Sequence, residues 1–159
     1  MSAVHEDPAE FAATLAPGAA LMGLDLGTKT IGVAVSDATR RIASPLRVIR
    51  RTKFTADAAT LAALATERGI GGIVLGLPRN MDGSEGPRAQ SARAFARNLT
   101  GVLPLPVALW DERLSTVEAE RALLVADASR RKRAEVIDQV AAGIILQGFL
   151  DRLAYLAAR

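Results

Sequence analysis

Two apolar segments joined by a short turn constrain the fold of this chain more than any other feature. Residues 21–25 predict a short buried strand, and residues 31–36 predict a strand that returns antiparallel to it across a turn at 27–30. A third strand is predicted at 43–49, where Pro45 indicates an edge position or a bulge. The sequence therefore predicts a sheet that begins with three antiparallel strands.

The rest of the chain alternates helical and strand patterns. Strands are predicted at 73–75 and 107–110, and helices from Thr55 to Arg68 with Gly69 as the stop, from Pro87, from Ser115 by capping-box spacing, and over 134–156. The resulting order, β-β-β-α-β-α-β-α-α, predicts an α/β fold in which three antiparallel strands and then parallel strands form a mixed sheet with helices on both faces.

The segment before the first strand has a different character. Residues 1–19 show weak periodicity and contain Pro8 and Pro17, which predicts a flexible N-terminal extension before one domain over 20–159. Its acidic residues do not fit an export signal, and the longest apolar stretch, 140–150, is short and contains Gln147. We therefore expect a cytoplasmic protein without a membrane partner.

Two residue types are nearly missing, and this restricts the chemistry. The chain has no cysteine, which excludes disulfide scaffolds, zinc–thiolate sites, iron–sulfur clusters and cysteine nucleophiles. Its one histidine, His5, lies in the polar N-terminal stretch, which argues against a Ser-His-Asp triad or a histidine-ligated transition metal. Catalysis would have to use carboxylates, hydroxyls, Arg or Lys, with hard cations that prefer oxygen ligands.

Carboxylates stand at three unusual positions. Asp25 ends an apolar strand, where open α/β sheets place ligands, although it could instead form a turn. Asp111 and Glu112 follow another strand and must point to opposite faces, so one of them can join Asp25, unless both belong to a loop that pairs with Arg113. Asp138 lies within an apolar helical stripe, which indicates a site or a buried ion pair.

These acids predict a metal site. Asp25, Glu112 or Asp111, and Asp138 would repel one another in one pocket, and Mg²⁺ or Mn²⁺ would relieve that repulsion. Two such ions about 3.5–4 Å apart can activate a water and stabilise the leaving oxygen of a phosphodiester. This mechanism needs no histidine.

Basic residues are clustered rather than spread along the chain. The net charge is only +3, but residues 40–53 contain six basic residues and no acidic one, and a second run covers 130–133. The segment 76–86, between a strand and a helix start, could also hold a phosphate. The expected nucleic-acid contacts are Lys29, Arg47, Arg50, Arg51, Arg79, Asn80, Arg88, Arg113 and Lys132. Solvated faces and an ordinary loop are the alternatives.

Five motifs, in order and spacing, resemble one known family. They are GLDLGTKTIGVAVSD at 23–37, ASPL at 43–46, GLPRNMDG at 76–83, DERLST at 111–116 and IDQVAAGIILQGFLD at 137–151. The sequence is similar to the YqgF family of pre-16S rRNA nucleases, also described as Holliday-junction-resolvase-like. The resemblance implies an RNase H-like fold and metal-binding roles for Asp25, Glu112 and Asp138, choosing Glu112 over Asp111.

The resemblance also implies an activity. We expect a divalent-metal nuclease that processes the 5′ end of pre-16S rRNA in ribosome biogenesis, with pre-ribosomal particles as partners. The alternatives are a resolvase of four-way DNA junctions and a nucleic-acid-binding assembly factor without catalysis. An ATP-using enzyme of the actin and sugar-kinase type is disfavoured, because two such domains do not fit in 159 residues.

Overall fold

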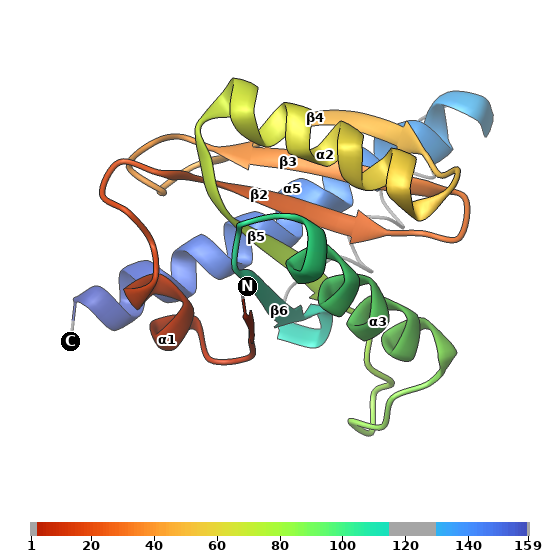
Figure 1. The fold of residues 1–159 in the computed structure, drawn as a ribbon. Coiled ribbons are helices and arrows are strands. Elements are labelled where there is room, and N and C mark those ends of the chain that lie inside the picture. The colour runs from red at the N-terminus through yellow and green to blue at the C-terminus, as the bar shows by residue number, and fades with distance from the viewer. Residues whose placement is uncertain (1–2, 115–129, 159) are drawn as a thin grey trace.

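A six-stranded sheet forms the centre of the molecule (Figure 1). The computed structural model describes residues 3–114 and 130–158. The strands are β1 (Val4–His5), β2 (Ala20–Leu26), β3 (Thr30–Ser36), β4 (Ala43–Arg50), β5 (Ile70–Leu77) and β6 (Val107–Asp111), in the spatial order β1-β6-β5-β2-β3-β4. The described helices are α1 (Pro8–Ala13), α2 (Phe54–Arg68), α3 (Pro87–Val102), the 3₁₀ turn η1 (Glu112–Leu114) and α5 (Arg130–Ala157).

The sheet is mixed, as the sequence predicts. β2, β3 and β4 pair antiparallel, whereas β5 pairs parallel with both β2 and β6. β4 is an edge strand, and its pairing with β3 shifts register between Val33 and Ala34, where Pro45 lies opposite. Because β2, β5 and β6 run in the same direction, their carboxyl ends share one edge of the sheet.

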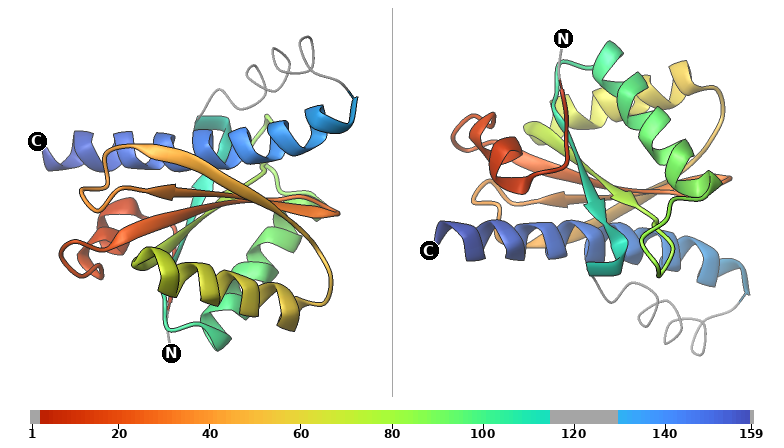
Figure 2. Two further views of the ribbon diagram at one scale, coloured as in Figure 1. Left: turned by 90° about the horizontal axis from the view of Figure 1, so that it is seen from above. Right: turned by 90° about the horizontal axis from the view of Figure 1, so that it is seen from below.

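Helices cover both faces of the sheet, with α2 and α3 on one side and α5 on the other (Figure 2). Strand alternation divides β2 between these layers: Met22 and Leu24 pack toward α2 and α3, and Leu21 packs toward α5. At Gly23 a Cβ atom would lie 2.6 Å from the Leu146 Cβ, so the missing side chain permits close approach of α5. Asp25 therefore belongs to the α5 face.

Local signals set most helix ends. Pro87 opens α3, and Gly69 ends α2 in the left-handed conformation with φ 65°, both as predicted. The prediction that Thr55 caps α2 is wrong, because the helix begins at Phe54. Buried Asp57 instead reaches back from the first turn and accepts hydrogen bonds from the Thr52 amide and hydroxyl. α5 begins within the basic run, and the helix predicted from Ser115 lies outside the described residues.

The N-terminal segment differs from the expected flexible extension. β1 pairs parallel with β6, and α1 packs beside the C-terminal half of α5. Phe11 is fully buried, with its ring 5.5 Å from that of Phe149 in an edge-to-face arrangement. The buried ring of Phe11 and the two paired residues of β1 attach this segment to the rest of the domain. So few residues produce no periodic pattern in the sequence.

α5 is apolar over a longer stretch than the sequence leads us to expect. Residues Ile137–Ala157 are long and apolar enough, with mean hydropathy 1.4, to cross a membrane by length and composition alone. Ala142, Ile145 and Phe149 are fully buried against the sheet. Packing against the sheet thus accounts for part of this segment, of which 33% is buried in the structure.

Candidate active site and nucleic-acid interface

Asp25 lies between two glycines at the end of β2. Its side chain is 4% exposed, and its partner on β3 is Gly32. On the other side Leu24 pairs with Leu75, so the next residues along the two parallel strands, Asp25 and Gly76, lie side by side. Direct cross-strand neighbours point to the same face of a sheet. The two positions flanking Asp25 on the α5 face therefore carry no side chains.

Asp138 occupies the space that Gly32 leaves. A Cβ atom at Gly32 would collide with the Asp138 carbonyl oxygen and would lie 2.6 Å from its carbonyl carbon. The Thr30 hydroxyl donates a 2.5 Å hydrogen bond to Oδ2 of Asp138. Among the side chains that the structure describes, no ion pair joins an Arg or Lys to this carboxylate.

Glu112 occupies the corresponding space on the other side. Its Cδ atom lies 3.2 Å from where a Cβ of Gly76 would be, next to the Asp25 position. Asp111 pairs in register with Leu77, which faces the α2 and α3 layer. Strand alternation therefore separates the two neighbouring acids as predicted, and it brings Glu112, not Asp111, to the face of Asp25.

We call Asp25, Glu112 and Asp138 the acidic face. As the side chains lie, no three His, Cys, Asp or Glu residues within 3–114 and 130–158 are grouped closely enough to hold a metal ion. The donor set nevertheless fits a hard cation, because every donor is a carboxylate oxygen and the glycines clear the space on both sides of Asp25. An ion bound here requires the flanking carboxylates to turn inward toward Asp25.

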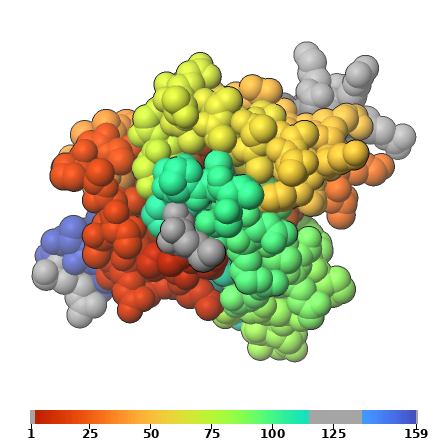
Figure 3. All heavy atoms as spheres, viewed as in Figure 1, coloured from red at the N-terminus to blue at the C-terminus, as the bar shows by residue number. Residues whose placement is uncertain are grey.

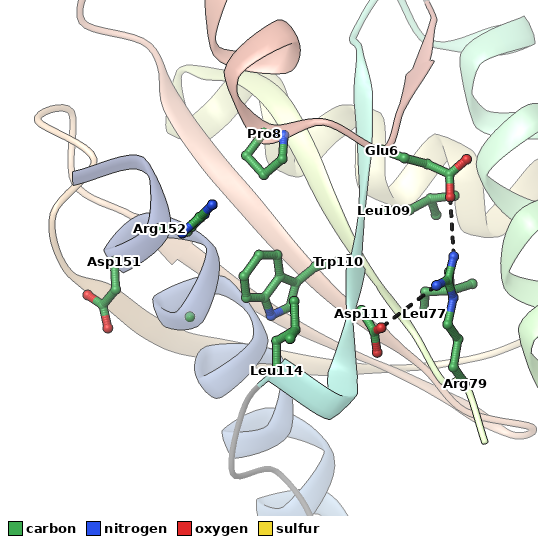
Figure 4. Close-up of a pocket in the computed structure, with 11 residues that line it drawn as sticks. Glu6, Pro8, Leu77, Arg79, Leu109, Trp110, Asp111, Leu114, Asp151 and Arg152 are labelled. Atoms are coloured by element: carbon green, nitrogen blue, oxygen red, sulfur yellow. Dashed lines mark ion pairs between the residues drawn. The ribbon is translucent and has the colours of Figure 1, made fainter. Parts of the chain in front are cut away.

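Asp111 belongs to a separate cluster of charges. Arg113 donates to its carboxylate at 2.7 Å, and this bond is the main reason that the pKa of Asp111 lies below its ordinary value of 3.8. Arg79 pairs with Asp111 and, at 3.5 Å, with Glu6 (Figure 4), and it also pairs with Glu85 at 3.3 Å. We call the cluster the ion-pair network; its members are Glu6, Arg79, Glu85, Arg93, Asp111 and Arg113.

The ion-pair network changes the expectation for two predicted nucleic-acid contacts. Arg79 and Arg113 face carboxylates within the protein, so their charge is largely compensated before any ligand arrives. The Asn80 side chain donates to the Ser84 hydroxyl inside the same loop. The network also borders a cavity of about 780 Å³, beside which Trp110 is 6% exposed and therefore part of the core.

Other predicted contacts lie near the end of β2. A cavity of about 200 Å³ separates the turn after β2 from the start of α3, and Arg51 and Arg88 both line it. Arg51 is held in place because its Nη1 donates to the Gly27 carbonyl at 2.7 Å. Lys29, Arg47 and Arg50 are exposed on the β2–β3 turn and β4. Lys132 lies in α5, but its side chain is outside the described set.

Sequence reasoning missed three residues of the site: Thr30, Gly32 and Gly76. The strand pattern could have suggested the two glycines, because Gly32 pairs directly with Asp25 and Gly76 lies one position beyond the pair of Leu24 with Leu75. The contact of Thr30 with Asp138 joins residues 108 positions apart, and no local pattern encodes it.

Comparison with known proteins gives the family. A model described as "RuvX: Holliday junction resolvase" matches residues 19–152. The chain belongs to the RuvX family. A protein of Cereibacter sphaeroides is 72% identical to this RuvX chain over 153 residues, which cover 96% of both, and one of Paracoccus denitrificans is 69% identical over 96% and 97%. Both relatives are named "Putative pre-16S rRNA nuclease".

Solved structures show the fold of this RuvX chain. Thermus thermophilus RuvC in complex with a Holliday junction substrate aligns with a TM-score of 0.54 and 12% identity, covering 86% of this chain and 96% of RuvC. The yeast mitochondrial Holliday junction resolvase Ydc2 gives 0.50 and 13%, covering 93% and 84%. The predicted RNase H-like α/β fold is thereby confirmed, as is the family resemblance.

Proposed function

We propose that this RuvX-family chain is a divalent-metal-dependent nuclease that cleaves phosphodiester bonds of structured nucleic acid, with pre-16S rRNA as its substrate. One observation carries the proposal: Gly32 and Gly76 flank Asp25, and their missing side chains admit Asp138 and Glu112 to its face. The names of the relatives support the RNA substrate. We also propose that the protein acts in the cytoplasm, on pre-ribosomal particles.

Each site residue has a task in this reaction. Mg²⁺ or Mn²⁺ bound by Asp25, Glu112 and Asp138 would supply a Lewis acid and an activated water. Asp25 is fixed by its place inside a strand, and Thr30 holds Oδ2 of Asp138 so that the other oxygen can face the site. Arg51 and Arg88, beside the end of β2, would bind backbone phosphates of the substrate.

A cleavage assay tests the proposal. The purified protein is incubated with a 5′ pre-16S rRNA fragment and with a four-way DNA junction, in Mg²⁺, Mn²⁺ or EDTA. We expect metal-dependent cleavage of the RNA, lost in Asp25→Asn and kept in Glu67→Gln, an exposed acid on α2 that serves as the control. Equal cleavage by Asp25→Asn and the parent would show that the proposed site is wrong.

Junction resolution is the second candidate. The description of the family model and the junction bound to the RuvC neighbour support it. The same assay separates the two, because a resolvase cuts the four-way junction and leaves the RNA fragment intact.

A further inference from the structure

One loop presents an exposed apolar side chain at the edge of the sheet where the acids lie. Residues 78–86 connect β5 to α3, and Met81 at the loop tip is 89% exposed, the highest value among the exposed large apolar residues of the described chain. The loop projects from the body of the molecule, at the lower right of Figures 1 and 3. An isolated exposed apolar residue needs no explanation by itself, so the case depends on how this one is held.

The loop tip is held by its own hydrogen bonds. The Gly83 amide donates to the Asn80 carbonyl and the Asn80 amide to the Ser84 carbonyl, both at 2.9 Å. Gly83 has φ 89°, a conformation that favours glycine. Asp82 accepts from the amide and the hydroxyl of Ser84. Met81 therefore stands at the tip of a closed turn.

The ion-pair network braces the base of the same loop. Glu85 binds Arg93 at 2.6 Å and Arg79 at 3.3 Å, which joins both ends of the loop to the protein. Arg113 reaches from η1 toward the Met81 carbonyl, at 3.5 Å. Arg113 directly follows Glu112 of the acidic face, so the loop tip is connected to the element that positions one of the three acids. Leu114, next along η1, is also exposed, at 67%.

The charges of the loop indicate which part of a nucleic acid it can meet. Within 78–86 the only cation, Arg79, is paired with three carboxylates, while Asp82 and Glu85 are acidic. Attraction to phosphates therefore cannot draw this tip to the substrate. What the tip offers is an apolar, polarisable thioether, which suits the faces of nucleobases.

We propose that Met81 is an apolar wedge that contacts unstacked nucleobases close to the cleaved phosphate. Proteins that distort nucleic acids insert apolar side chains, Met and Leu among them, between base steps. The braced turn lets Met81 enter without a further loss of loop entropy on binding. This inference rests on the proposed nuclease function, and it assigns to the ion-pair network the task of presenting Met81.

Base unstacking tests the wedge directly. The probes are a branched pre-16S rRNA fragment and a four-way DNA junction, each with 2-aminopurine near the branch point, whose fluorescence rises when the base unstacks. The proteins are the parent, Met81→Ala, Met81→Leu and Val102→Ala; Val102 is 58% exposed at the far end of α3. Binding is measured without metal, and kcat and KM with Mg²⁺.

The expected pattern is specific to a wedge. The parent, Met81→Leu and Val102→Ala raise the fluorescence alike, whereas Met81→Ala loses most of the rise and has a KM higher by about tenfold, the scale of one lost apolar contact. Its thermal unfolding stays like that of the parent, because the side chain is exposed. A Met81→Ala protein with unchanged fluorescence and KM overturns the wedge alone. A parent that neither binds nor cleaves either probe overturns the wedge and the nuclease proposal together.

Discussion

Asp111 and Glu112 are neighbours in the sequence, yet they belong to two regions with opposite character. Asp111 joins the ion-pair network, where Arg113 and Arg79 compensate its charge. Glu112 joins the acidic face, beside Gly76 and Asp25. The charges of the ion-pair network hold a loop, whereas the acidic face brings together carboxylates whose mutual repulsion a bound cation would relieve. The alternation of a single strand end separates the acid of the ion-pair network from the acid of the candidate metal site.

Replacing each of these two acids by its amide should have the largest effects on cleavage and stability. Glu112→Gln is expected to lower cleavage at least about a hundredfold, since a site that stabilises charge loses one of its donors, while the fold stays intact. Asp111→Asn is expected to keep most of the cleavage and to lower the free energy of unfolding by about 1 kcal/mol, because it weakens a partly buried ion pair. Rates and urea unfolding measure both. If Asp111→Asn lost cleavage and Glu112→Gln lowered only the free energy of unfolding, the separation of the two regions would be wrong.

A methyl group beside Asp25 should have the next largest effect. Gly32→Ala places a Cβ against the Asp138 backbone, so we expect the free energy of unfolding to fall by roughly 3 kcal/mol and cleavage to fall with it. Gly101→Ala is the matched control, because its Cβ would meet nothing within 4 Å and α3 should gain roughly 0.5–1 kcal/mol. Unfolding of Gly32→Ala at the parent's denaturant midpoint would show that the close approach is unimportant.

Thr30 should have a smaller effect, confined to the acidic face. Thr30→Val removes the hydroxyl that orients Asp138, and we expect about a tenfold weaker affinity for Mn²⁺, the usual scale for a lost partner of a metal ligand. Thr30→Ser keeps the donor and should restore the affinity. Electron paramagnetic resonance of free Mn²⁺ gives the affinity without a cleavage assay. If valine and serine bound Mn²⁺ equally well, the hydrogen bond would not matter.

Lowering the pH should weaken the ion-pair network, and this is the smallest of the expected effects on stability. Hydrogen bonds from Arg93 and Arg113 hold the pKa values of Glu85 and Asp111 below their ordinary 4.5 and 3.8. The folded state therefore gains stability above these ordinary values and loses it as the pH falls toward the lower folded ones. The double variant Glu85→Gln/Asp111→Asn should show a flatter decline of the unfolding midpoint as the pH falls below about 5. An unchanged slope would mean that other acids dominate.

The sequence predicts the fold and marks two of the candidate acids because local patterns encode them. Apolar runs broken by Gly27 and Gly69 define the strands and helix ends, and Asp25 and Asp138 stand out against apolar surroundings. The alternation after β6 correctly separates Asp111 from Glu112.

The ion-pair network and the N-terminal packing could not be predicted in the same way. Arg79 meets Glu85 of its own loop and also Glu6 and Asp111 from other parts of the chain, and each looks like an ordinary surface charge in the sequence. Phe11 gives no periodic signal, although it is fully buried. Such contacts form between residues that only the tertiary fold brings together. A pattern of a few neighbouring positions in the sequence does not reveal them.

Direct location of the metal tests the central claim. Crystals of the parent grown with Mn²⁺ would be examined by anomalous scattering, with Asp25→Asn crystals as the control. We expect an anomalous peak beside Asp25, within ligand distance of the Glu112 and Asp138 carboxylates, and no such peak in Asp25→Asn. A parent that cleaves RNA while its Mn²⁺ binds away from these three acids, or an unchanged peak in Asp25→Asn, would contradict the assignment of the acidic face as the catalytic metal site.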